Sequence, residues 1–474
     1  MSVAVTQQNK IESQSRNYPR LVLLTASLAV LLAQIDTSVV NLALKSIGSE
    51  LRAGVSQMQW VIDAYNLVYA CLLLTAGTLG DLYGRRRIFA LGVVLFSAGT
   101  LTCSLAPNVG ILIAGRVVSG FGAAFAVPMS LVLLTVAYPG REERAHAMGI
   151  WASCNGLAFI IGPTLGGWLL DSIGWRSIFY LALPVCAVTL ALTYYAVGES
   201  SAPQGRKLDM PGQGLGIVGL GAFAFAAIEG SHWGFLSAPI VAIACIAIAA
   251  LVLFVWVESR TSGPLLPISF LRRPVFSAAL ASAGLMTFGM YALLFIMPLY
   301  FQIMRGASPL IAGLELLPMS ASFVIVSQLV GYATNALGPR VVMTAGMACM
   351  GLGEIALAFI GADTNIVMVS LALFVVGIGL GLNTAPVNGV AVAALPPERS
   401  GTASGVLNTA RMVGATLGVA ILGAVFAAYA GQQPTGPGFF VGLRAALGAG
   451  GTAELIGAII TFGLIRHDSL KAKN

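Results

Sequence analysis

Acidic side chains lie inside several long apolar segments of this sequence. The clearest is Asp36, within "LLAQIDTSVVNLAL" (residues 31–44), and Asp63 lies in a second such segment. A charge at bilayer depth costs at least about 2.5–3.5 kcal/mol, so it is rarely placed there without a partner or a task. A desolvated carboxylate can bind and release a proton, or it can pair with a cation. These residues therefore predict proton or cation chemistry, provided that the segments cross a membrane.

The composition indicates a membrane protein. Of the 474 residues, 57% are hydrophobic and only 9% are charged, whereas a soluble domain carries about 25% charged residues. The 56 glycines suit a bundle in which small residues let helices approach closely. The six cysteines all lie in apolar segments without metal-ligand spacing, so we expect no metal and no cofactor. The net charge of +7 does not indicate nucleic-acid binding, because in a membrane protein the placement of Lys and Arg matters more than their sum.

Apolar stretches of about 20 residues predict an all-α polytopic fold with fourteen transmembrane helices. The predicted spans are 20–43, 57–79, 88–106, 110–134, 145–170, 176–197, 212–230, 237–257, 275–301, 311–334, 341–361, 366–392, 402–428 and 438–465. With these spans, 18 of the 25 Lys and Arg residues fall on the side of the two termini and only 4 on the other side. Cytoplasmic loops carry such an excess, so we expect both termini in the cytoplasm.

Two segments repeat across the chain. "GTLGDLYGRRR" (77–87) follows the second span, and "GYATNALGPRV" (331–341) follows the tenth with the same spacing of glycine, Asp or Asn, glycine and arginine. Such repeats are typical of transporters in which two halves rock about a central site. The expected organisation is a cytoplasmic tail (1–19), a six-helix bundle (20–198), an inserted two-helix hairpin with its flanking loops (199–274), a second six-helix bundle (275–465) and a second tail (466–474).

Several motifs resemble those of the major facilitator superfamily, specifically its branch of fourteen-helix drug:proton antiporters. "GTLGDLYGRRR" is similar to the superfamily's loop motif, "RVVSGFGAAFAVP" (116–128) to its helix 4 motif, and "GIWASCNGLAFIIGPTLGG" (149–167) to the antiporter motif of helix 5. "IDTSVVNLAL" resembles the acidic helix 1 motif of this branch. "FAAIEGSHWG" and "AGLELLPM" are most like the methylenomycin-resistance proteins. The resemblance implies two major-facilitator bundles.

The loop and helix 5 motifs are the candidates for conformational gating. Glycines allow tight turns and flat helix faces, and a proline inside a helix removes one backbone hydrogen bond. The alternatives are a simple topology anchor for the loop motif and plain close packing for the helix 5 motif. The candidate gating residues are Gly77, Asp81, Gly84, Arg85, Arg86, Gly162, Pro163, Gly166 and Gly167.

The embedded charges are the candidates for proton and substrate coupling. Arg116 is the nearest plausible cation partner of Asp36 by topology, and a static ion pair is the alternative to a coupling role. The candidate coupling residues are Asp36, Asp63, Arg116, Glu354 and Glu454, with Glu315 and Arg411 as further polar positions of the second half.

The predicted function is proton-coupled export of small amphipathic toxic compounds across the cytoplasmic membrane. The alternatives are proton-coupled uptake of a metabolite on the same fold and, with less support, a membrane sensor or enzyme. No P-loop, H-E-x-x-H or G-x-S-x-G pattern occurs, which argues against an enzyme. The expected partners are a small-molecule substrate, protons and the lipid bilayer, with the protein as a monomer.

Overall fold

The computed structural model describes residues 18–201, 208–261, 264, 266, 268–396, 399–431 and 436–465, and this part of the chain is helical without strands. The helices before the middle of the chain are α2 (Pro19–Leu51), α3 (Val55–Tyr83), α4 (Arg85–Ser104), α5 (Val109–Ala137), α6 (Arg141–Ile161), η1 (Gly162–Gly166), α7 (Gly167–Ser172), α8 (Arg176–Ala196), α9 (Met210–Trp233) and α10 (Ala238–Arg260). Those after it are α11 (Ile268–Leu271), α12 (Pro274–Leu299), η2 (Tyr300–Met304), α13 (Pro309–Glu315), α14 (Leu317–Leu337), α15 (Pro339–Ala358), α16 (Ile366–Ala393), α17 (Ser400–Leu417), η4 (Gly418–Leu422), α18 (Gly423–Ala430) and α19 (Gly438–Leu464). The elements labelled η are single turns of π-helix.

The predicted number of spans is confirmed. Thirteen helices of the described residues are long and apolar enough to cross a membrane, and the bent pair Val55–Leu73 and Thr75–Tyr83 makes a fourteenth if it counts as one span. The main difference lies at "GDLYGRRR", which is not a long loop: α3 continues to Tyr83 and α4 starts at Arg85. Only Gly84 separates them, with a φ of +106° that glycine adopts without strain.

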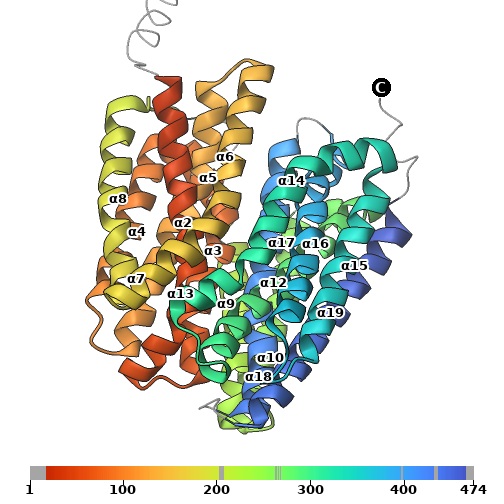
Figure 1. Cartoon of the computed structure of the whole chain (residues 1–474). Helices are drawn as coiled ribbons and strands as arrows, with labels where there is room; N and C mark the ends of the chain where they lie inside the picture. The colour runs from red at the N-terminus through yellow and green to blue at the C-terminus, as the bar shows by residue number, and fades with distance from the viewer. Residues whose placement is uncertain are drawn as a thin grey trace, which may run out of the picture.

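The spans form two six-helix bundles, and Figure 1 shows α2–α8 beside α12–α19. The α9–α10 hairpin packs against the first bundle through α3, where Trp60 Nε1 donates to Glu229 Oε1 at 2.9 Å and Gln213 Nε2 donates to the Cys71 carbonyl at 2.8 Å. The same hairpin reaches the second bundle, because Ile228 is buried in a cluster with Ala420. The hairpin is thus an insertion that contacts both bundles.

With fourteen spans, α2 begins and α19 ends on the same side of the molecule. We call the side of Pro19, Tyr83 and Leu464 the terminal end, and the side of Leu51 and Val55 the opposite end.

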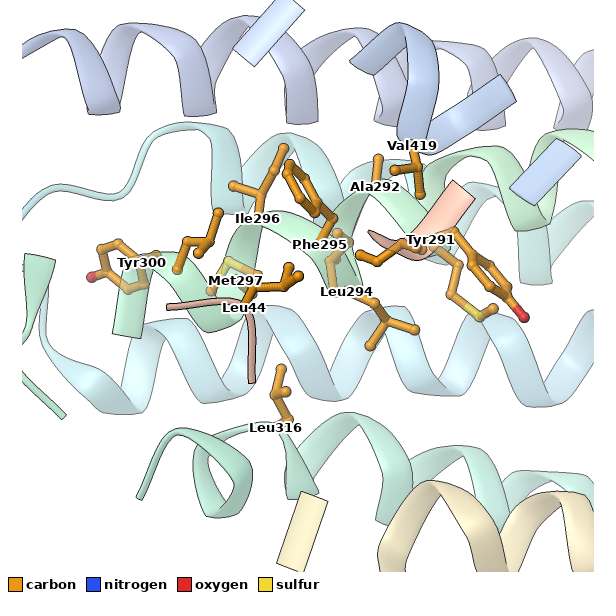
Figure 2. Packing of buried hydrophobic residues seen from close by; sticks show 14 of the residues in the cluster. Leu44, Tyr291, Ala292, Leu294, Phe295, Ile296, Met297, Tyr300, Leu316 and Val419 are labelled. Atoms are coloured by element: carbon orange, nitrogen blue, oxygen red, sulfur yellow. The ribbon is translucent and has the colours of Figure 1, made fainter. Parts of the chain in front are cut away.

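A single apolar core joins the bundles in the half of the molecule nearer the opposite end. It contains Leu44 of α2 together with Tyr291, Phe295 and other residues of α12, and Leu316 after α13. Figure 2 shows these side chains interleaved between the helices. Close van der Waals packing of these side chains favours contact between the bundles at this level, because apolar burial away from lipid gives no hydrophobic driving force.

The two bundles diverge toward the terminal end in Figure 1. Nearer the opposite end they are joined by the apolar core that contains Leu44 and Phe295. The bundles therefore contact each other closely toward the opposite end, and their helices separate toward the terminal end.

Candidate functional site

Asp36 of α2 and Arg116 of α5 form a buried ion pair. Arg116 Nη1 donates to Asp36 Oδ2 at 2.5 Å. The Asp36 side chain is 7% exposed and the Arg116 side chain is 1% exposed. Arg116 Nε also donates to the Val61 carbonyl of α3 at 2.9 Å, and its guanidinium lies 4.5 Å from the ring centroid of Tyr65. Because arginine stays protonated in proteins, its buried charge requires a partner such as this carboxylate. The pair thus connects three helices of the first bundle.

Asp63, the second acidic candidate of this bundle, lies one helical turn from this site. Its side chain is fully buried, and neither carboxyl oxygen has a hydrogen-bond partner. A buried carboxyl without a cation is stable in its neutral form, so Asp63 is available to hold a proton.

In the second bundle, Glu354 of α15 and Glu454 of α19 are fully buried, and their carboxyl oxygens have no hydrogen-bond partner. Arg411 of α17 is half-buried and donates from Nη2 to the Thr384 carbonyl at 2.9 Å. Glu315 is half-buried at the opposite end. The structure therefore brings the two deep glutamates into the core and leaves Glu315 near the surface.

The helix 5 motif lies where the two bundles meet. Its segment Gly162–Gly166 is a π-helical turn, a feature that often marks functional sites. A Cβ at Gly162 would lie 2.6 Å from Ser38 Oγ of α2, and one at Gly167 would lie 2.8 Å from the Cα of Leu310 of α13. A Cβ added at Gly313 of α13 would collide with the Pro163 carbonyl. The motif therefore lets α2 of its own bundle and α13 of the other bundle approach together.

A second π-helical turn, Gly418–Leu422, holds the corresponding place in the second bundle. Gly418 packs against the Phe288 carbonyl of α12, the first helix of its own bundle. Gly423, directly after the turn, packs against Gln59 of α3 in the other bundle. Each of these π-turns thus lies against the first helix of its own bundle and close to the second helix of the other bundle. The two sets of contacts correspond to each other as the two halves of the sequence do.

The loop motif forms a charge cluster at the terminal end. Asp81 accepts a hydrogen bond from Arg85 Nη2 at 2.8 Å, which joins the end of α3 to the start of α4. Glu199, just after α8, accepts from the backbone N–H of Arg86 at 3.1 Å. The Glu199 carboxylate also occupies the space beside Gly84, where a Cβ would lie 2.8 Å from its Cδ. Gly77, by contrast, faces open space.

Hydrogen bonds between the bundles were not foreseen from the sequence. Lys45 Nζ donates to the Gln302 carbonyl at 2.7 Å, and Gln302 Nε2 donates back to the Leu42 carbonyl at 2.9 Å. Ser308 Oγ donates to Asp171 Oδ2 at 2.7 Å. The first two bonds join residues 257 and 260 positions apart, so no local sequence pattern could have revealed them. They lie at the opposite end and close it.

Two helical bundles that hold buried charges and are joined toward one end are typical of membrane transporters. The comparisons with known proteins agree: residues 26–419 match the model of the Major Facilitator Superfamily. The chain belongs to this superfamily. It is accordingly a multi-pass membrane transporter of small molecules rather than an enzyme.

The similar proteins share names connected with drug resistance. The chain is 38% identical over 409 residues to the multidrug resistance protein Stp of Mycobacterium tuberculosis, covering 86% of this chain and 76% of the relative. It is 34% identical over 411 residues to the methylenomycin A resistance protein of Streptomyces coelicolor, covering 86% of each. These relatives confirm the resemblance seen in the motifs. Among solved structures, a mutant of a peptide transporter has a TM-score of 0.68 over 93% of both chains at 14% identity, which shows the shared fold.

Proposed function

We propose that this protein exports small amphipathic toxic compounds across the cytoplasmic membrane in exchange for protons, by alternating access. The printed names of the relatives, which include multidrug resistance proteins and a drug efflux pump, support the substrate class. The observation that carries the proton half is the buried Asp36–Arg116 pair. The excess of Lys and Arg on the side of the termini supports cytoplasmic termini.

In the proposed mechanism, Asp36 binds a proton and thereby loses its ion pair with Arg116. Ionised Asp36 neutralises the arginine and holds α2 against α5, a role that the 2.5 Å contact supports. Protonated Asp36 no longer compensates the positive charge, and an uncompensated charge in a low-dielectric interior is costly. Arg116 then depends on the Val61 carbonyl and the Tyr65 ring alone. Protonation therefore weakens the packing of α2 within its bundle.

The position of Asp36 connects this change to the interface between the bundles. Ser38 and Val39, two and three residues farther along α2, contact Gly162 and Gly166 of the helix 5 motif. That motif in turn packs against α13 of the other bundle through Pro163. A shift of α2 is thus transmitted to the contact that closes the opposite end. We assign gating to this motif and to the loop motif, with the bundles 20–198 and 275–465 as the moving halves.

Under this assignment, the structure faces the cytoplasm. The bundles separate toward the terminal end, where Gly77 and Gly149 face open space, and that end is cytoplasmic in the proposed orientation. A compound from the cytoplasm would enter here and reach the level of Asp36. Release outward requires the contacts at the opposite end, such as the Lys45–Gln302 hydrogen bond, to break.

Aromatic side chains support an amphipathic substrate. Tyr65 and Tyr69 of α3 pack edge to face with ring centroids 6.1 Å apart. Tyrosine offers an apolar ring with a polar tip, which suits compounds of mixed polarity. The Tyr65 ring also lies beside Arg116 of the buried ion pair, at 4.5 Å from the guanidinium.

The experiment that tests the proposal uses the purified full chain in sealed liposomes that contain a pH-sensitive dye. Addition of a cationic amphipathic drug to the compartment facing the terminal end should move protons in the opposite direction to the drug. An imposed proton gradient should drive drug accumulation against its own gradient. Movement of protons and drug in the same direction would indicate proton-coupled uptake instead. Drug movement that does not depend on the proton gradient would overturn proton coupling.

A further inference from the structure

Glu354 and Glu454 of the second bundle meet beside one glycine of α12. A Cβ at Gly289 would lie 2.8 Å from Glu354 Oε1 and closer still to Glu454 Oε1. On the other side, a Cβ at Gly450 would lie 2.6 Å from Glu354 Oε2. Both side chains are fully buried, and the four carboxyl oxygens have no hydrogen-bond partner. The two carboxyl groups therefore face a common space that exists because residues 289 and 450 have no side chain.

The backbone of α15 and α19 produces this meeting. The two helices cross at Gly351 and Gly451, where the carbonyl oxygen of each lies 2.6 Å from the Cβ position of the other. Each glutamate follows its crossing glycine by three residues, which is about one helical turn. Both side chains consequently leave the crossing at the same level and toward α12. The pairing is a consequence of the close glycine contact.

No cation of the neighbouring helices compensates this pair within the described residues. The titratable side chains on the elements packed against α15 and α19 face other groups or the surface. Arg340 and Arg444 stack on Phe462 and Phe359. Tyr291 of α12 is a buried residue of the apolar core, Cys349 is half-buried, and Tyr332 and Tyr429 are exposed. Two ionised carboxylates in such a space would repel each other at low dielectric, so at least one of them must carry a proton in this arrangement.

We propose that Glu354 and Glu454 form one shared proton-binding site, separate from the Asp36–Arg116 pair and located in the other bundle. Its contribution to proton exchange rests on the proposed antiport. The site binds a proton while α12 packs closely against α15 and α19. It releases the proton to water when α12 moves away and the carboxylates become hydrated. The second bundle thus has its own protonation-dependent packing contact.

The test is the infrared spectrum of the purified full chain as a function of pH, because a protonated carboxyl gives a carbonyl band that an ionised carboxylate does not. Glu354→Gln and Glu454→Gln keep the shape of the protonated side chain, so we expect both to fold. In a shared site, each single variant should move the pH at which the remaining carboxyl titrates by about one unit or more. The double variant should lose both bands. Glu229→Gln, which alters a glutamate of the hairpin, is the control and should leave the pair unchanged.

Two results would overturn the shared site. One is a remaining carboxyl that titrates at the wild-type pH in both single variants, since the residues would then be independent. The other is a wild-type pair that is ionised throughout the pH range in which the protein is folded. Gly289→Ala gives a second measurement, because its methyl group should push the carboxyls apart and alter their bands. The control Gly284→Ala, whose methyl group would meet only the Ala410 carbonyl at 3.4 Å, should leave the bands unchanged. Because these spectra need no transport, a failure of proton-coupled export in liposomes would be recognised separately.

Discussion

Asp36→Asn tests both the stability and the coupling role of the buried ion pair. The change keeps the size of the side chain and one oxygen acceptor but removes the negative charge that faces Arg116 at 2.5 Å. Breaking a buried pair by removing one partner costs about 3–5 kcal/mol, because the remaining charge is uncompensated. Arg116 keeps its hydrogen bond to the Val61 carbonyl and its contact with the Tyr65 ring. We therefore expect a loss near the lower limit, about 3 kcal/mol.

The assay combines unfolding with transport in the same preparations. Asp36→Asn should lower the unfolding temperature and reduce proton-driven drug export at least about tenfold, which corresponds to about 1.4 kcal/mol. Asp363→Asn, which alters an exposed carboxylate, is the matched control and should change the free energy of unfolding by less than about 0.5 kcal/mol.

The double variant Asp36→Asn/Arg116→Gln separates the two roles. Neutralising both partners removes the uncompensated charge, so much of the lost stability should return. Export should stay uncoupled from the proton gradient, because the titratable group is absent. Recovery of proton-driven export in the double variant would refute the coupling role and leave Asp36 as a structural counter-charge. Wild-type stability of Asp36→Asn would refute the energetic reasoning itself.

Three further predictions concern the interface, the orientation and the energy source. In a cell-based drug-efflux assay, Gly313→Ala should slow export several-fold, because its methyl group would collide with the Pro163 carbonyl at the contact between the bundles. The control Gly331→Ala, whose methyl group would face open space, should export normally. A reporter fused after Lys473 should be active in the cytoplasm, and a signal on the outer side would contradict the proposed orientation. Export should stop when a protonophore removes the proton gradient, and export that continues until ATP is depleted would contradict proton coupling.

The fold could be predicted from the sequence because the membrane imposes a strong and local signal. A span must contain about 20 apolar residues, and each such stretch can be read without knowledge of its neighbours. Helix ends were less certain. The prediction ended the second span at residue 79, whereas α3 continues to Tyr83. Asp81 at the end of α3 pairs with Arg85 at the start of α4, which compensates charges that had suggested a loop.

The candidate site could be predicted only in part. Arg116 was matched with Asp36 because the resemblance gave both residues a place in one bundle. Glu354 and Glu454 were selected as separate residues, since each is an isolated charge in an apolar helix. Their meeting at Gly289 depends on three helices and on crossing angles that side-chain periodicity does not specify.

Two of the π-turns, Gly162–Gly166 and Gly418–Leu422, connect the proposed coupling sites with the proposed gate. Each turn packs against the first helix of its own bundle and the second helix of the other: Gly162–Gly166 lies beside Ser38 of α2, and Gly418–Leu422 lies beside Phe288 of α12. Asp36 lies two residues before Ser38, and Gly289, which borders the glutamate pair, directly follows Phe288. In the first bundle the buried carboxyl lies on the helix that contacts the π-turn, and in the second bundle the two carboxyls lie beside that helix. In the proposed mechanism, a change of protonation at either site would therefore act on a helix that also forms the interface, without a long chain of intermediate residues between the proton and the gate.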